Sequence, residues 1–157
     1  STEELVEQLL PFLNRDLSLE VKRPISREYV GQIVPLIQER LMRLGEAGEL
    51  CGFFFLDELD YNSALLLGKT LTGEIARGGL EAALGRLQDL PFDAASLENV
   101  LRPLAAELGL KTGEFFGLLR LATTGRPAAP PLFQTMSVLG RERCLERIEE
   151  ALAKLRG

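Results

Sequence analysis

The chain has 157 residues, of which 46% are hydrophobic and 26% are charged, a composition typical of a globular protein with a real core. It contains no histidine and no tryptophan. The lack of histidine excludes Ser-His-Asp and Cys-His nucleophiles, histidine-ligated zinc and a histidine general base, which together supply a large share of hydrolytic chemistry. The composition therefore disfavours an enzyme.

Cysteine usage and the apolar runs indicate the compartment. Cys51 and Cys144 lie far apart in the chain, without a C-x-x-C spacing, which favours a reducing setting. The longest apolar runs, 53–56 and 64–67, fall far short of the roughly 20 residues that span a membrane. We therefore expect a cytoplasmic protein with no membrane partner. Because the chain opens on Ser1 rather than Met, we also expect an excised domain.

Charge is distributed unevenly along the chain. The net charge of -5 argues against a protein that coats nucleic acid indiscriminately, and we expect no DNA partner. Residues 1–101 carry 9 basic and 17 acidic side chains, whereas residues 102–157 carry 9 basic and 6 acidic ones, so the last third can face a polyanion. Arginine outnumbers lysine by 14 to 4, which suits forked hydrogen bonding and stacking on bases. A GC-rich genome would enrich arginine in the same way.

Apolar spacing in the first part of the chain is helical. It predicts a helix over 5–13 that is interrupted near Pro11, and a short helix and a loop after it. Ser26 is suited to cap the next helix, which we expect to run to Gly45 with a kink at Pro35. The aromatic segment 51–56 is predicted to fill the core or to form a brief strand.

The rest of the chain gives stronger helical signals. Two helices are expected within 60–90, separated near Gly68. Further helices are predicted after a cap at Asp93 or Ser96 up to Gly109, from Thr112 to the stop at 123–125, over 132–139 and over 141–155, with a stiff proline loop over 126–131. We find no alternating pattern longer than four residues. The predicted architecture is all-α, with about eight or nine short helices in two packed subdomains, 1–58 and 59–157.

Candidate catalytic and metal-binding patterns are weak. An acidic cluster over 57–60 lacks the spacing of an EF-hand, and such a cluster is more often a solvated helix cap. The run Gly68-Lys69-Thr70 resembles the end of a phosphate-binding loop, but Ser63 stands where the first glycine is required. The sequence therefore predicts no catalytic residue and no metal site.

Three motifs in the last third of the chain carry a family resemblance. They are LLRLATTGRP over 118–127, PPLF over 130–133 and LGRER over 139–143. In this order and spacing they resemble the C-terminal anticodon-binding region of bacterial glutamyl-tRNA synthetase. The resemblance extends upstream through 100–102 and 109–111, and more loosely through 29–44, so that it covers nearly the whole chain.

The resemblance implies an all-helical, monomeric module that binds the anticodon arm of glutamate tRNA while a separate domain performs the ligation. The signatures of that catalytic domain, H-I-G-H and K-M-S-K-S, cannot occur here, because the chain has no histidine and its four lysines are isolated. The parent enzyme would be a glutamate-tRNA ligase that uses ATP and magnesium. This chain by itself would be non-catalytic and without a cofactor.

The resemblance also implies which residues contact the anticodon. Prolines 127, 130 and 131 keep the loop stiff, so little ordering entropy is lost on binding, and Arg126 can supply forked donors or stack. Similarity to the family places Arg120, Ala129, Pro130 and Leu132 at anticodon-contacting positions and Arg102 and Lys111 at phosphate or base contacts.

One expected contact bears on specificity. The looser alignment over 29–44 places Arg40 on a helix where an arginine of the discriminating family members inspects the third anticodon base. In that register, Arg40 favours the type that charges only the glutamate tRNA over the relaxed type that also charges the glutamine tRNA.

Two other interpretations stand beside RNA binding. An arginine flanked by leucines, such as Arg120, is most often a surface residue whose stem covers apolar neighbours. The chain as a whole could instead be a helical protein-protein interaction module that docks a partner through an exposed Phe53-Phe54-Phe55.

Overall fold

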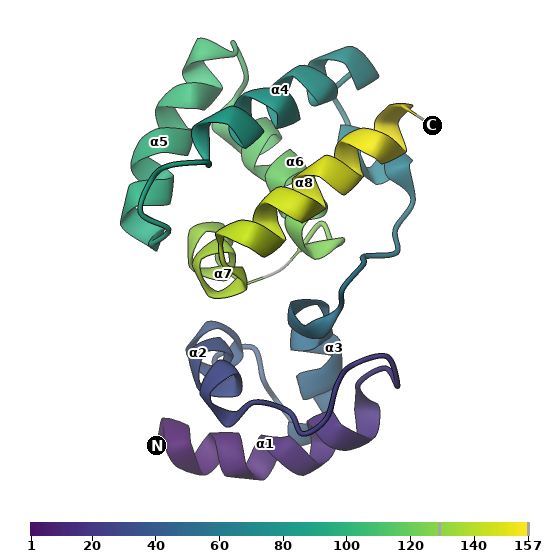
Figure 1. The fold of residues 1–157 in the computed structure, drawn as a ribbon, viewed down its shortest axis with the longest axis vertical. Coiled ribbons are helices and arrows are strands. Elements are labelled where there is room, and N and C mark those ends of the chain that lie inside the picture. Colours follow the sequence, from purple (N-terminus) through teal and green to yellow (C-terminus); the bar gives the residue numbers. More distant parts are fainter. Residues whose placement is uncertain (129, 157) are drawn as a thin grey trace. The chain divides into compact units, whose positions relative to one another are not determined.

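A computed structural model describes residues 1–128 and 130–156, which form eight α-helices, three short 3-10 helices and no strand (Figure 1). The predicted all-α fold is therefore confirmed. The chain divides into two compact units, Ser1–Asp57 and Glu58–Gly157. These units correspond to the expected subdomains apart from residue 58, and the role of each in anticodon binding stays a prediction. Among the described residues, no helix has the length and apolar character needed to cross a membrane.

Unit 1 contains three α-helices and two 3-10 helices. They are α1 (Thr2–Asp16), α2 (Arg27–Ile37), η1 (Leu44–Glu46), α3 (Ala47–Cys51) and η2 (Gly52–Phe55). The hydroxyls of Ser1 and Ser26 accept hydrogen bonds from backbone N–H groups in the first turns of α1 and α2, which satisfies donors that a helix start leaves free. The predicted cap at Ser26 is confirmed.

Three expectations for unit 1 are wrong. Helix α1 continues through Pro11 to Asp16, because the buried Leu9 and Leu13 pack on either side of the proline and hold the helix in place. Residues 17–26 form turns and not a short helix. Helix α2 ends at Ile37, well before the expected end at Gly45.

The hydrogen bonds after α2 show how this helix ends. Pro35 lies in its last turn and cannot donate a backbone hydrogen bond. Beyond Ile37 the hydrogen bonds change to the tighter three-residue spacing, since the N–H of Arg40 donates to the carbonyl of Ile37 at 2.9 Å and that of Leu41 to Gln38 at 3.4 Å. The chain therefore leaves the helix in a turn.

The phenylalanine segment lies in the core of unit 1. Phe53 and Phe54 are 2% and 0% exposed and stack with ring centres 4.3 Å apart. The ring of Tyr29 meets Phe54 and Phe55 edge-on, and its hydroxyl donates to the carbonyl of Phe54 at 3.0 Å. The segment therefore fills the core, as a 3-10 helix and not a strand. The interaction module built on exposed Phe53 and Phe54 is not favoured, because these rings are already buried.

Unit 2 is built around one central helix. Its elements are η3 (Ser63–Leu67), α4 (Gly73–Arg86), α5 (Ala94–Glu107), α6 (Thr112–Thr124), α7 (Leu132–Leu139) and α8 (Arg141–Arg156). Helix α6 contacts η3 and the other four α-helices of the unit, and it is buried over most of its circumference (Figure 1). The predicted stops agree with the structure, since Gly125 and Gly140 follow the ends of α6 and α7 with positive φ angles.

Candidate nucleic-acid interface

The loop that follows α6 is set by Gly125. This residue has φ +74° in the left-handed region, and its N–H donates to the carbonyl of Leu121 at 2.8 Å. A Cβ on Gly125 would make ordinary contacts with Tyr61 at 3.4 Å and Leu59 at 3.6 Å, so the positive φ angle and not lack of space is what favours glycine here. The next N–H, of Arg126, donates to the hydroxyl of Thr124 at 3.1 Å. Together these contacts determine the direction in which the chain leaves the helix.

A buried arginine anchors the same helix end. Arg147 on α8 is 1% exposed, and its Nη1 donates to the carbonyl of Thr123 at 2.6 Å. A cation at a helix C-terminus is favoured by the helix dipole and by the carbonyls that the last turn leaves free. Arg147 therefore ties α8 to the turn that precedes the loop.

Sequence reasoning missed Arg147 because arginine is seldom buried. A signal was nevertheless present. The buried stripe of α8 runs through Cys144, Ile148 and Ala151, and position 147 lies on this stripe, three residues after Cys144. Burial raises the pKa of the Cys144 thiol to about 12, in spite of the opposing charge of Arg147.

Four expected contact residues gather at the junction of α6, the loop and α7. Arg120 and Arg126 are half-buried, Pro130 is buried, and Leu132 is 5% exposed. Ala129 lies outside the described residues. In this conformation the two arginines offer more side-chain surface than Pro130 and Leu132, whose side chains support the loop from within.

Arg102 belongs to a small cluster of stacking groups, which we call the Arg102 platform and define as Arg102, Phe116 and Phe133. The guanidinium of Arg102 on α5 lies 5.2 Å from the centre of the Phe116 ring on α6. Phe116 meets Phe133 on α7 edge-on, with ring centres 5.1 Å apart and planes at 86°. Arg120 follows Phe116 by four residues, so it lies on the same face of α6. This cluster could not be predicted from the sequence, since its members come from three separate helices.

Lys111 lies at the opposite end of α6. Its backbone N–H donates to the carboxylate of Glu114 at 2.9 Å, and the Thr70 hydroxyl donates to the same carboxylate at 2.5 Å. The Thr70 hydrogen bond and then the Lys111 one lower the pKa of Glu114. Nine residues of helical rise, about 14 Å, separate Lys111 from Arg120, so the structure does not bring these two together.

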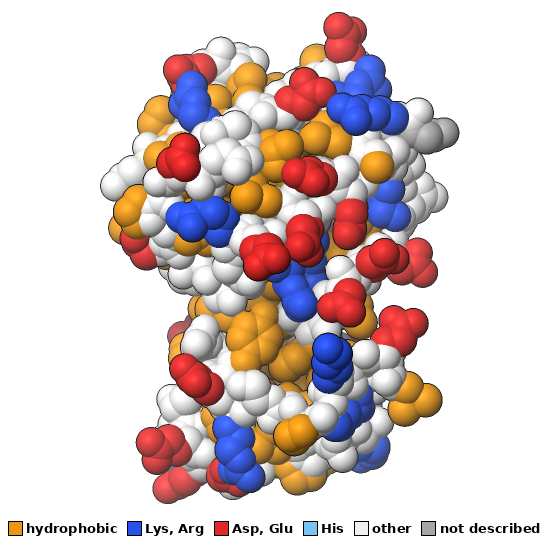
Figure 2. All heavy atoms as spheres, in the orientation of Figure 1, with side chains coloured by type: hydrophobic (Ala, Val, Ile, Leu, Met, Phe, Trp, Pro, Cys, Tyr) orange, Lys and Arg blue, Asp and Glu red, His pale blue; other side chains and the backbone are white. Residues whose placement is uncertain are grey.

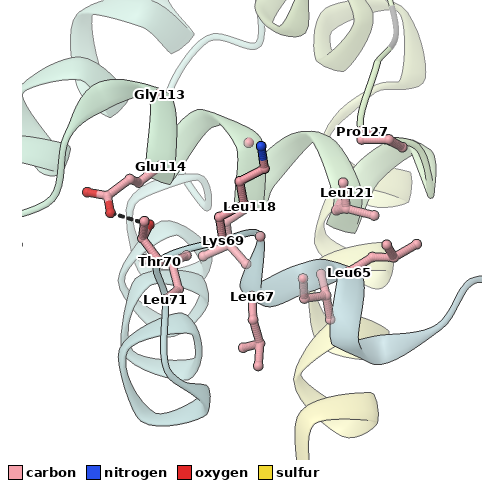
Figure 3. Close-up of a pocket in the computed structure, with 13 residues that line it drawn as sticks. Leu65, Leu67, Lys69, Thr70, Leu71, Gly113, Glu114, Leu118, Leu121 and Pro127 are labelled. Atoms are coloured by element: carbon pink, nitrogen blue, oxygen red, sulfur yellow. Dashed lines mark hydrogen bonds between the residues drawn. The ribbon is translucent and has the colours of Figure 1, made fainter.

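A groove of about 290 Å³ runs between η3 and α6 (Figure 3). Lys69, Thr70 and Glu114 line one end, leucines line its sides, and Pro127 of the loop lies at the other end. The sequence did not predict this groove, because its walls come from segments about 45 residues apart.

Arg40 belongs to unit 1 and does not lie on a helix. It is exposed in the turn that follows α2, so the expected helical placement is wrong. Met42, 83% exposed, and the exposed Arg43 follow in the same segment. A base-reading role for Arg40 stays a prediction.

Acidic side chains gather on the face of unit 2 that carries α8 (Figure 2). Burial, followed by repulsion from Glu58, raises the pKa of Glu150 on this helix. Glu142, Glu146 and Glu149 add further acidic side chains to α8, which also carries five basic ones, so the helix as a whole is not negatively charged. The glutamates of α8 make this face less suited to a phosphate backbone than the loop after α6, which carries Arg120 and Arg126.

A comparison with known protein families identifies the class of domain to which this fold belongs. The family model described as an anticodon binding domain matches residues 4–152. The chain therefore belongs to the anticodon-binding domain family.

Its relatives are ligases. The chain is 50% identical over 156 residues to a glutamate–tRNA ligase of Dehalococcoides mccartyi strain CBDB1, covering 99% of this chain and 32% of that protein. It is 46% identical to the corresponding ligase of Roseiflexus castenholzii, again over 99% of this chain and 31% of the relative. The chain thus spans about a third of the length of these relatives.

A solved structure shares the fold. A glutamate tRNA ligase from Elizabethkingia meningosepticum superposes with a TM-score of 0.78 at 23% identity, covering 98% of this chain and 31% of that one. At this level of identity, the similarity concerns the fold alone.

Proposed function

We infer that this chain binds the anticodon arm of glutamate tRNA and serves as the anticodon-binding part of a cytoplasmic glutamate-tRNA ligase. Ligation, with ATP and magnesium, would belong to a catalytic domain outside the chain. The observation that carries the proposal is the loop after α6, where Arg120 and Arg126 flank a helix end held by Gly125 and Arg147 within the matched family region.

The chemistry of this loop suits unstacked bases. Proteins read single-stranded RNA loops by stacking and by hydrogen bonds to base edges. The guanidinium groups of Arg120 and Arg126 can do both. The left-handed Gly125 and the prolines restrict the loop before binding, which lowers the entropy lost when RNA is bound.

A titration tests the proposal. Fluorescence anisotropy with a labelled glutamate-tRNA anticodon stem-loop, at two salt concentrations, should show weak binding that falls steeply with salt, because only a few basic side chains can neutralise phosphates. A stem-loop with the same stem and a changed anticodon is the control. Equal affinity for both, or no binding at low salt, would contradict the proposal.

Arg120→Ala is the matching protein variant. Its side chain lies at the loop end of α6 and is half-buried, so we expect weaker RNA binding with the melting temperature lowered by only a few degrees. Circular dichroism melting run beside the titration separates the two effects. A large loss of stability with unchanged affinity would show that Arg120 serves the fold alone.

A further inference from the structure

We propose that Thr124 is a positioning residue of the RNA site, whose hydroxyl fixes the backbone of Arg126 relative to that of Arg120. This inference rests on the proposed function, because these are the two arginines that the proposal places against the anticodon loop. Thr124 is only 2% exposed, so it would act through the two arginines and not by touching RNA itself.

The hydroxyl of Thr124 joins the end of α6 to the loop that follows it. It donates to the carbonyl of Arg120 at 2.7 Å and accepts a hydrogen bond from the N–H of Arg126 at 3.1 Å. The carbonyl of Arg126 lies 3.3 Å from the same oxygen. A threonine hydroxyl has one proton and two lone pairs, so the shorter bond to Arg120 uses the proton and a lone pair accepts from the loop. One oxygen therefore ties the backbones of both arginines together.

The neighbouring Thr123 shows what sets this contact apart. Its hydroxyl donates to the carbonyl of Leu119, also at 2.7 Å, and the residue is 0% exposed. Such a bond to the residue four positions earlier is ordinary for a threonine inside a helix. Thr124 makes the same kind of bond and in addition accepts from the N–H of Arg126, the first residue after the left-handed Gly125. The two threonines thus differ in their contact with the loop.

The contact favours binding by restricting the loop before RNA arrives. Without the hydroxyl, the N–H of Arg126 loses this acceptor, and the backbone after Gly125 is less restricted relative to the helix. Arg126 then has to be ordered on binding, which lowers the affinity. The charges of both arginines stay in place, so the dependence of affinity on salt should not change.

The experiment compares three variants of the chain. Thr124→Val removes the hydroxyl and keeps the branched shape, and Thr124→Ser keeps the hydroxyl. Thr123→Val, which retains the carbonyl that accepts from Arg147, is the matched control. With the labelled glutamate-tRNA anticodon stem-loop as the probe, we expect Thr124→Val to bind about fivefold more weakly, the order of ordering one further side chain, with the salt slope of the wild type. Thr124→Ser and Thr123→Val should bind as the wild type does.

Hydrogen exchange followed by NMR tests the contact directly. The N–H of Arg126 should exchange slowly in the wild type, in Thr124→Ser and in Thr123→Val, and faster in Thr124→Val, because only this last variant lacks the hydroxyl that accepts from it. Circular dichroism at the temperature of the titration confirms that the variants are folded.

The outcomes separate the two proposals. If the wild type binds and Thr124→Val binds equally well, Thr124 serves the helix alone and the positioning inference is wrong. It is also wrong if Thr123→Val weakens binding as much, or if Thr124→Ser fails to restore it. Fast exchange of the Arg126 N–H in the wild type would overturn the inference without any variant. If the wild type binds no stem-loop at all, the proposed function is itself wrong, and this inference falls with it.

Discussion

The two segments that carry the expected anticodon-reading arginines differ in how their backbone is determined. In unit 2, the loop after α6 starts at the left-handed Gly125, and the helix end before it is anchored by the buried Arg147. In unit 1, the segment 38–46 that carries Arg40 follows α2 without a glycine or proline at its start, and the chain leaves the helix through a turn. The glycine turn after α6 depends on neighbouring residues and can be predicted from the sequence. The Arg147 anchor and the end of α2 depend on packing and on the balance of hydrogen bonds, and they cannot.

The anchor of the unit 2 loop gives the largest expected effect. Arg147→Ala removes a fully buried side chain and leaves the carbonyl of Thr123 without that donor, so we expect about 3 kcal/mol less stability. Urea unfolding followed by circular dichroism measures it. Hydrogen exchange at the N–H of Gly125 should also become faster.

Arg156→Ala is the control for this prediction, because Arg156 is an exposed arginine on the same helix whose ion pair with Glu81 lies at the surface. It should cost no more than about 0.5 kcal/mol. If both variants lose the same free energy of unfolding, the hydrogen bond from Arg147 to Thr123 does not hold the helix end before the loop. The contrast between the two segments would then not stand.

The comparison also explains which helix ends could be predicted from the sequence. Helices α5, α6 and α7 begin or end at residues whose side chain or φ angle acts locally, among them Asp93, Gly125 and Gly140, and their ends are close to the predicted ones. The end of α2 depends on the balance between helical hydrogen bonds and packing after Pro35, which no single residue signals. The helical continuity of α1 through Pro11 likewise depends on tertiary packing.

The site shows the same division. Arg120 and Arg126 could be placed beside the loop because the motif and the stop signal lie together in the sequence. The Arg102 platform, the groove of Figure 3 and the bond from Arg147 to Thr123 each join segments that are distant in the chain. Only the three-dimensional packing of η3 and of α5 to α8 brings these residues into contact.

The second largest expected effect concerns Arg40. It tests whether a side chain on a turn whose backbone no glycine or proline determines can still read an RNA base. In the full-length ligase, Arg40→Gln should lower discrimination against the glutamine tRNA, because a long charged side chain that reaches a pocket for a pyrimidine excludes the larger purine. By analogy with base-reading contacts in DNA, the change is worth roughly 1 to 3 kcal/mol.

The measurement for Arg40→Gln is the ratio of kcat/KM for the two tRNAs, with glutamate charging expected to fall only modestly. Arg43→Gln, in the same exposed segment, controls for the general loss of one positive charge. An unchanged ratio would make Arg40 an ordinary solvent-facing residue.

A pair of glycine substitutions tests the backbone contrast directly. Gly125→Ala forces a side chain into the left-handed region of φ, so we expect it to cost about 1 to 2 kcal/mol. Gly45→Ala, at the end of the Arg40 segment, has ordinary space for a Cβ, 3.7 Å from Arg15, and should be neutral or slightly stabilising. Thermal melting of both variants is sufficient. A costly Gly45→Ala would show that the unit 1 segment is as tightly specified as the loop.

The smallest expected effect concerns Glu150, whose negative charge adds to burial in raising the pKa of Tyr61. Because the pKa of Glu150 is raised in the folded chain, the folded state holds its proton to higher pH than the unfolded state does. Stability is therefore lost as the pH rises from the ordinary glutamate pKa through the raised one, and the charged form remains unfavourable above it.

Glu150→Gln should raise the melting temperature at pH 7, by an amount worth no more than about 0.5 kcal/mol for this partly exposed group, and the gain should vanish near pH 4. Glu149→Gln, the exposed neighbour on α8, is the control for the loss of one negative charge. If the melting temperature rises equally at both pH values, or equally in the two variants, the burial of Glu150 near Glu58 does not lower the stability of the folded chain.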